Sequence, residues 1–132
     1  MAKETGLGWT TGSIDDSGGN VRAIKNDIHS MEFSTPRAVQ DVTGIDMSAI
    51  ERLHLLADYS ATFNGTFNDA SGLSHDVFKD LANARTITLV ISGQTLAVEA
   101  LLTDYALNRA DDGSLTWTVP AVLANGTVPT WA

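Results

Sequence analysis

Strict alternation of apolar and polar residues is the feature that most constrains how this chain folds. From residue 59 to residue 67, Tyr, Ala, Phe, Gly and Phe occupy every second position, with short uncharged polar residues between them. A period of two residues is that of a β-strand with one buried and one wet face. We therefore predict a strand here, with a wet face formed by Ser60, Thr62, Asn64 and Thr66.

The same pattern predicts most of the remaining chain to be extended. Three strands are expected at 85–91, 96–102 and 115–119, joined by the hairpin turns "SGQT" and "ADDG". Upstream, a strand with a bulge is expected over about residues 21–35, ending before Pro36, and a short extended segment follows it in "RAVQDVTGID".

Two segments carry helix signals. Ser48 and Glu51 have the spacing of a capping box, and the apolar residues that follow predict a short helix near 49–56. Ser74 as N-cap and Asp76 in the first turn predict the main helix over about 74–83. The expected fold is mainly β: a β-sandwich or strongly curved sheet with one flanking helix.

Length and charge bound the classes of protein that this chain can belong to. Its 132 residues are sufficient for one domain, 1–132. Eight basic and sixteen acidic residues give a net charge of −8, which disfavours binding to nucleic acid or anionic lipid through a basic patch. Cysteine is absent, and Glu99 interrupts the longest apolar run. We expect a soluble protein, made in the cytoplasm, without membrane insertion.

No residue pattern predicts catalysis, a metal ion or a cofactor. His29, His54 and His75 lack the spacing of metal ligands. The acidic pairs Asp15–Asp16 and Asp111–Asp112 stand beside glycine in turns, where aspartate is common, and lack the ligand spacing of a calcium loop.

Aromatic residues near both ends are unusual for segments that only contact water. Trp9 lies in a Gly-, Thr- and Ser-rich N-terminal arm, residues 1–20, and Trp131 lies in a C-terminal tail, residues 120–132. Such residues dock either on a neighbouring molecule or on the chain's own core, and the sequence leaves both interpretations open.

Several segments, taken together, resemble a known family. They are "ETGLGWTT" at 4–11, "TPRAVQDVTGID" at 35–46, "SAIERLHLLADYSATFNGTFND" at 48–69, "HDVFK" at 75–79 and "GTVPTWA" at 126–132. The chain thereby resembles, over essentially its whole length, the tail tube (major tail) proteins of long-tailed bacteriophages, particularly actinobacterial siphophages.

The resemblance implies a structural virion protein and no enzyme. Subunits of this family form rings, commonly hexameric, that stack into a hollow tube through which DNA passes as transient cargo. It also implies assembly in the bacterial host cytoplasm and contact with tape-measure, tail terminator and baseplate or tail-tip proteins. The polar strand face then lines the lumen or meets solvent on the outer wall. The expected assembly surface comprises Trp9, Val39, Val42, Ile45, Met47, Val122, Leu123, Val128 and Trp131.

Three other interpretations remain open. A monomeric or dimeric β-sandwich module would hold a sugar or peptide with Trp9 or Trp131. A glycan-cleaving enzyme would need Asp104 to converge with Asp111 or Asp112 in a cleft. A tail terminator or head–tail connector would share the tube fold but form a single ring.

Overall fold

The computed structural model describes residues 5–132, and most of them form antiparallel strands. The strands are β1 (Trp9–Asp15), β2 (Val21–Ala23), β3 (Ile28–Ser34), β4 (Arg37–Asp41), β5 (Arg52–Ala57), β6 (Ser60–Thr66), β7 (Arg85–Ile91), β8 (Gln94–Leu102), β9 (Ala106–Arg109) and β10 (Leu115–Leu123). The helical segments are two 3₁₀ turns, η1 (Gly6–Gly8) and η2 (Lys25–Asp27), and one α-helix, α1 (Ser74–Phe78).

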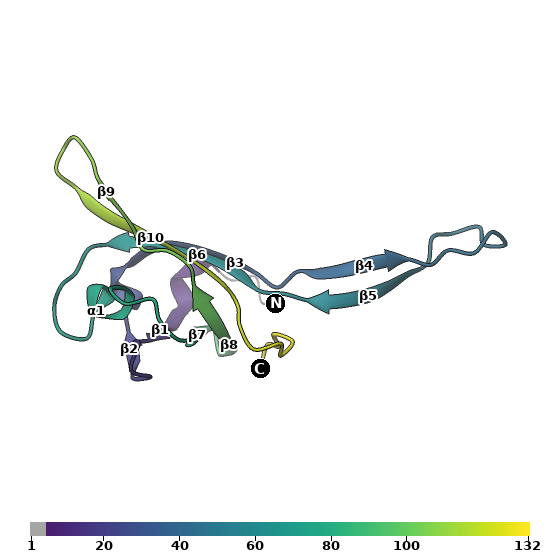
Figure 1. Ribbon diagram of the computed structural model, residues 1–132, viewed down its shortest axis with the longest axis horizontal. Helices are drawn as coiled ribbons and strands as arrows, with labels where there is room; N and C mark the ends of the chain where they lie inside the picture. The colour runs from purple at the N-terminus through teal and green to yellow at the C-terminus, as the bar shows by residue number, and fades with distance from the viewer. Residues whose placement is uncertain (1–4) are drawn as a thin grey trace.

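The main sheet contains eight strands and bends back on itself. Its order is β2-β1-β7-β8-β10-β6-β3, with β9 beside β10, while β4 and β5 form a separate two-stranded ribbon (Figure 1). β1 and β3 stand near opposite ends of this order, yet the rings of Trp9 and Phe33 lie 6.1 Å apart. No pairing joins β1 to β3 within residues 5–132, so the curved sheet stays open. The predicted mainly β fold is confirmed.

The apolar core fills the inside of this curve. In β6 the predicted alternation is confirmed, because Ala61, Phe63 and Gly65 are buried while the residues between them are half-buried or exposed. The predicted inner residues of β8, namely Leu96, Val98, Ala100 and Leu102, are likewise all buried. Burial of one such leucine or phenylalanine side chain contributes about 1.5–3 kcal/mol.

The backbone of η2 passes very close to β6 at Gly65. A Cβ atom at this position would lie 2.0 Å from the carbonyl oxygen of Asp27 and 2.5 Å from the Trp117 ring. The Trp117 Nε1–H donates to the Thr66 carbonyl at 2.8 Å, which holds the indole across the glycine. Only glycine therefore fits at the crossing of these two segments.

The predicted main helix is real but ends at Phe78, not at residue 83. Val77 and Phe78 are buried, and the Phe78 ring packs 4.8 Å from that of Trp117. Ser74 is the first helical residue rather than the N-cap: its N–H donates to Asp27 Oδ2 at 3.2 Å. No helix among residues 5–132 is long and apolar enough to cross a membrane.

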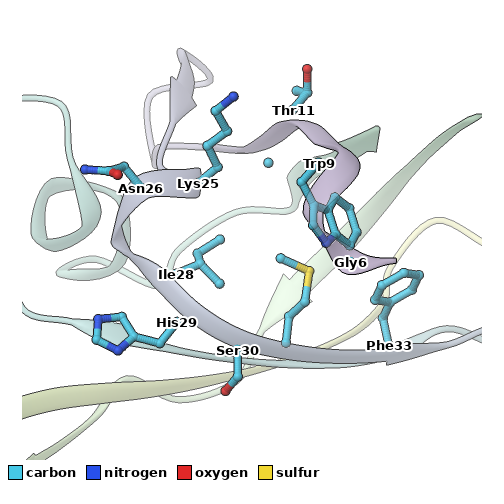
Figure 2. Close-up of a pocket in the computed structure, with 11 residues that line it drawn as sticks. Gly6, Trp9, Thr11, Lys25, Asn26, Ile28, His29, Ser30 and Phe33 are labelled. Atoms are coloured by element: carbon cyan, nitrogen blue, oxygen red, sulfur yellow. The ribbon is translucent and has the colours of Figure 1, made fainter. Parts of the chain in front are cut away.

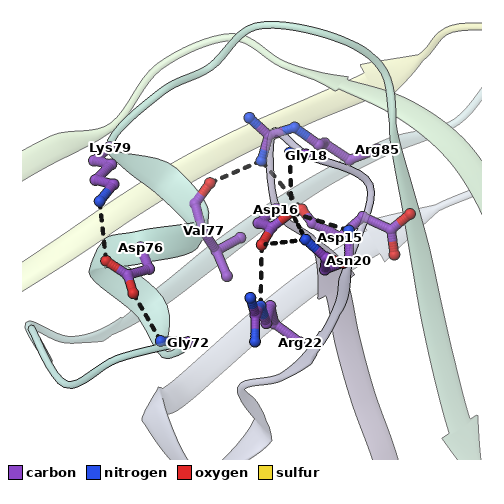
Figure 3. A network of polar contacts seen from close by, with 10 residues as sticks. All are labelled: Asp15, Asp16, Gly18, Asn20, Arg22, Gly72, Asp76, Val77, Lys79 and Arg85. Carbon is purple, nitrogen blue, oxygen red and sulfur yellow. Dashed lines mark hydrogen bonds and ion pairs between the residues drawn. The ribbon is translucent and has the colours of Figure 1, made fainter.

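Arg85 explains why the helix ends early. Its guanidinium is fully buried and donates hydrogen bonds to the carbonyls of Val77 (2.7 Å) and Asp15 (3.1 Å) (Figure 3). It also donates to the carbonyls of Ala82 (3.0 and 3.1 Å) and Asp80. These contacts satisfy carbonyls that a longer helix would have bonded internally. One side chain thus joins the end of α1, the loop after it and the end of β1.

The predicted helix at 49–56 is wrong. Residues 52–57 form β5, which pairs with β4 in the registers Val39↔His54 and Asp41↔Arg52. The Glu51 N–H donates to Thr43 Oγ1 at 2.8 Å and not to Ser48, so the apparent capping box does not form. An apolar helix face in this segment would have no core to pack against, whereas pairing with β4 satisfies the backbone hydrogen-bonding groups.

Two further predictions need correction near the N-terminus. The strand expected over 21–35 divides into β2 and β3, because η2 interrupts it; the expected bulge is the register shift between Ile28 and Ser30. Residues 9–15 of the expected arm form β1, between β2 and β7 in the main sheet, and residues 1–4 lie outside the described chain.

The expected C-terminal tail also begins inside the sheet. β10 continues to Leu123, and beyond it Trp131 forms an isolated bridge with Leu96. The Ala132 N–H donates to the Thr95 carbonyl at 2.8 Å, so the end of the chain is tied to β8.

The turn after β1 is held by one carboxylate. Asp16 accepts hydrogen bonds from the N–H groups of Asn20 (3.0 Å) and Gly18 (2.9 Å) and from Arg22 Nε (3.0 Å) (Figure 3). These bonds, that from the Asn20 N–H foremost, lower the pKa of Asp16 from 3.8 to about 2. The depressed pKa means that Asp16 stabilises the fold above pH 4, and that this contribution disappears as the pH falls through 2.

We predict that Gly65→Ala destabilises the protein strongly. The added methyl group must displace the Asp27 backbone or the Trp117 ring, and overpacking of this kind costs about 1–3 kcal/mol or more. Urea unfolding followed by tryptophan fluorescence measures the loss. Gly6→Ala is the control, since its Cβ meets nothing within 4 Å; equal stability of the two variants would contradict the close approach at Gly65.

We predict that Asp16→Asn lowers the melting temperature at pH 6 but not at pH 2. The amide cannot replace the charged acceptor at pH 6, whereas near pH 2 the native carboxyl is itself becoming protonated. Thermal melts between pH 2 and pH 6 test this, with Asp69→Asn as the control because its side chain makes no hydrogen bond within residues 5–132. A difference between Asp16→Asn and the parent that does not change with pH would contradict the role of the charge.

Candidate assembly interface

Four neighbouring strands present a largely polar face on the side of the sheet away from the core, which the apolar residues Ala106, Pro120 and Val122 share. We define this polar face by Ser30, Glu32 and Ser34 of β3, Ser60, Thr62, Asn64 and Thr66 of β6, Thr116 and Thr118 of β10, and Asn108 of β9, which the strand registers align. Ser60 and Thr66 are exposed, while Thr62 and Asn64 are half-buried. Glu32 is the single charged residue in the set, so the face is nearly neutral.

The side chains of the polar face bond to one another across the strands. Thr118 Oγ1 donates to Asn64 Oδ1 at 2.7 Å, and the hydroxyls of Ser34 and Ser60 lie 3.1 Å apart. The Thr66 hydroxyl contacts the His29 ring in the same way. These bonds hold short side chains against the sheet, so few groups project from this surface.

Both edges of this four-stranded region are open. β3 pairs only with β6, and β9 pairs only with β10, so each leaves a row of backbone donors and acceptors without a partner strand within the described chain. Exposed strand edges are templates for pairing with another chain. The edges therefore mark two surfaces on which a further strand can add.

The ribbon of β4 and β5 projects far from the body along the long axis of the molecule (Figure 1). Every residue from 37 to 56 is exposed except Val42, which is half-buried. A two-stranded hairpin alone is marginally stable in water. The ribbon thus lacks the packing that would hold it in place in an isolated subunit.

The projecting hairpin is rich in exposed apolar side chains. They are Val39, Ile45, Met47, Ile50, Leu53, Leu55 and Leu56, of which Ile45 and Leu56 are almost completely exposed. The far end also carries acidic residues, including Asp41, whose pKa is lowered by hydrogen bonds from the Thr43 hydroxyl and N–H. The register places Val39 and Leu53 on opposite faces of the ribbon, so both faces carry apolar side chains that another protein could cover.

The two terminal tryptophans contact the chain's own sheet. Trp9 packs edge-on against Phe33, and Trp131 lies 6.1 Å from the same ring while remaining 44% exposed. This is the docking on the core that the sequence left open. Of the other expected assembly residues, Val122 and Val128 are exposed and Leu123 is half-buried, and their participation in assembly stays a prediction.

The residues considered for chemistry do not converge. His29 contacts Thr66 on the polar face, His54 lies on the hairpin, and His75 Nδ1 stands 3.3 Å from the Tyr105 hydroxyl. Among residues 5–132, no group of three histidine, aspartate or glutamate side chains is placed to hold a metal ion.

The aspartates considered for glycan cleavage act as turn formers. Asp104 accepts the Tyr105 N–H at 2.8 Å, and Asp112 accepts the Ser114 N–H at 3.0 Å, each in an exposed turn. The hydrogen bonds from Ser114 lower the pKa of Asp112. An exposed turn does not provide the closed cleft in which two carboxyl groups act on a glycosidic bond.

Comparison with known proteins identifies a fold. No protein-family model and no curated protein sequence matches this chain. A chain of the virion of a native gene transfer agent particle matches with a TM-score of 0.76 and 14% identity, over 97% of this chain and 99% of that one. A chain of the tail of an empty gene transfer agent particle, with C6 symmetry, matches with a TM-score of 0.70 and 14% identity, over 98% of each chain.

The matched chains come from a gene transfer agent virion and from the tail of such a particle. At 14% identity the likeness establishes the fold alone, which agrees with the resemblance to tail tube proteins predicted from the sequence. The matches extend over 97% or more of this chain, so they include the curved sheet, the projecting hairpin and the short helix.

Two exposed leucines are absent from the assembly surface predicted from the sequence. Leu107 of β9 is 48% exposed and Leu115 of β10 is 37% exposed, although both lie on the core side of the sheet. Leu115 begins a strand predicted from the sequence, whereas Leu107 lies outside the predicted strands, and the β9–β10 ribbon that carries both leucines extends beyond the body (Figure 1).

Proposed function

We propose that this protein is the structural subunit of a phage-type tail tube. Copies join into rings, the rings stack into a hollow tube in the virion, and DNA passes through the tube without chemical change. The observation that carries the proposal is the fold shared over 97% or more of the chain with chains of a virion and of a tail with C6 symmetry. By analogy with that symmetry, we propose six copies in each ring.

Strand direction supports closure of such a ring. β3, β6, β10 and β9 alternate in direction, because each adjacent pair is antiparallel. With an even number of strands, a copy related by rotation about the ring axis presents its β9 antiparallel to β3 of the next copy. Each open edge then gains a partner, and the polar faces of all copies join around a central channel.

The chemistry of the polar face suits a channel for DNA. Phosphate groups bind lysine and arginine, and this face has neither. Hydroxyl and amide groups already bonded across the strands, with one carboxylate for each copy, give DNA no anchor. The net charge of −8 acts in the same direction. Placement of this face on the outer wall is the alternative that the test below addresses.

Contact between successive rings is the role we propose for the projecting hairpin. Its apolar side chains, including Val39, Ile45 and Met47, lie too far from the body to be covered within one subunit (Figure 1). Val42 and the terminal residues Trp9, Val122, Leu123, Val128 and Trp131 complete the proposed assembly surface. Tape-measure, terminator and tail-tip proteins are the further partners, and assembly takes place in the host cytoplasm.

Negative-stain electron microscopy of the concentrated protein tests the proposal, with hollow tubes of uniform width as the expected result. The matched variant replaces residues 40–53 by Asn-Gly, a turn that joins the paired residues Val39 and His54. We expect a folded body with an unchanged melting temperature, and rings that do not stack. Normal tubes from the variant would contradict the role of the hairpin. A parent protein that stays monomeric even with other tail proteins would contradict the proposed function.

A lysine on the polar face should trap DNA inside the tube. Thr62→Lys adds one cation for each subunit at the centre of this face, and we expect its tubes to protect a short duplex from nuclease. Raising the salt from about 50 to 200 mM should release the duplex. Ser71→Lys, in the exposed loop before α1 and outside the proposed assembly surface, is the control and should leave DNA accessible to nuclease. Equal protection by both variants would place the polar face outside the lumen.

A further inference from the structure

An open groove of about 590 Å³ lies beside β3. It runs between β3 and the first half of β1, and its apolar lining includes Trp9, Ile28, Met31 and Phe33 (Figure 2). All four side chains are only partly buried against the core. Lys25 stands at the rim, where its Nζ donates to the Thr10 carbonyl at 3.0 Å. The sheet is therefore incompletely covered at the point where it fails to close.

We infer that this groove is a socket for β9 of a second copy of the chain, with Leu107 entering the groove and the Asp111–Asp112 turn meeting Lys25. The inference rests on the proposed ring. It names the side chains that make the contact between β9 of one copy and β3 of the next, here called the joint, specific.

The strand registers determine which side chains enter. Leu107 stands opposite the buried Trp117, and Met31 stands opposite the buried Phe63, so both project to the core side of the sheet. If β9 of one copy extends the sheet at β3 of the next, Leu107 and Met31 come to the same side as cross-strand neighbours. Their Cβ atoms would then lie about 4.5–8 Å apart, depending on register.

Burial also favours this occupant. Leu107 is 48% exposed in the isolated subunit, because the β9–β10 ribbon extends beyond its own body (Figure 1). The groove is lined by apolar side chains that are themselves only half covered. Insertion of Leu107 removes both exposed surfaces from water at once.

Charges match at both ends of the joint. In the antiparallel arrangement the end of β9 lies next to the start of β3, which brings the Asp111–Asp112 turn toward Lys25. At the other end, Asp104 just before β9 approaches Arg37 just after β3. Neither Lys25 nor Arg37 belongs to an ion pair within residues 5–132, so both cations are available to a neighbouring copy.

Cysteine cross-linking tests the socket, because the chain has no native cysteine. Assembled Met31→Cys/Leu107→Cys protein is treated with a short bismaleimide and separated by denaturing electrophoresis. We expect a ladder that stops at one closed ring, since contacts between rings would give an open-ended series. Ser30→Cys/Asn108→Cys is the matched pair on the polar face, because antiparallel pairing that sets Leu107 opposite Met31 also sets Asn108 opposite Ser30, and it reports ring closure alone.

The two pairs separate the inference from the function on which it rests. Cross-linking of the polar-face pair without the inner pair would overturn the socket and leave the ring intact. Tubes in which neither pair cross-links would overturn both the β9–β3 joint and the socket. A ladder from the inner pair that continues past one ring would also overturn the inference.

A second measurement uses uncross-linked protein. Leu107→Ser should raise the concentration needed for assembly about tenfold or more, because a buried leucine contact is lost from every joint. Leu101→Ser, which removes a 44% exposed leucine from β8, is the control and should change that concentration little. Lys25→Glu should weaken assembly in the same direction as Leu107→Ser. Equal effects of the two leucine substitutions would overturn the inference.

Discussion

The buried guanidinium of Arg85 organises the part of the molecule that a single curved sheet cannot cover by itself. It donates hydrogen bonds to backbone carbonyls from β1, from α1 and from the loop before β7. A buried charge is tolerated only when its donors are satisfied, so the loop must adopt the one path that supplies these oxygens. That path buries Val77 and packs the Phe78 ring against that of Trp117, which in turn lies across Gly65. The polar face keeps its shape because the side of the sheet behind it is fixed in this way.

Local periodicity was sufficient to predict the strands that the core holds. β6, β7, β8 and β10 each bury alternate residues, and the turn at Ser92 and Gly93 has positive φ at both positions, as a tight hairpin requires. Prediction failed where distant contacts decide the structure. α1 ends early because of Arg85, seven residues beyond it, and residues 52–57 are extended because β4 is available as a partner.

The candidate interface was predictable in part, for a related reason. Val39, Ile45 and Met47 could be identified as apolar residues in a polar, turn-rich setting, and the structure leaves them exposed. Trp9 carried the same signal, yet it packs on Phe33 because the curve of the sheet brings β1 to β3. Leu107 lies outside every strand predicted from the sequence, and the core that it fits belongs, in our proposal, to another copy of the chain.

The acidic end of the projecting hairpin has a consequence for the free subunit. Asp41, Asp46 and Glu51 are exposed near Ile45 and Met47, and Arg52, which stands opposite Asp41, is the one basic residue in the segment 41–52. Like charges of this kind repel one another and keep the apolar hairpin ends of separate molecules apart. The screening length of this repulsion falls from about 30 Å at 0.01 M salt to about 8 Å at 0.15 M. Ionic strength would then govern how closely two free subunits approach each other through their hairpins.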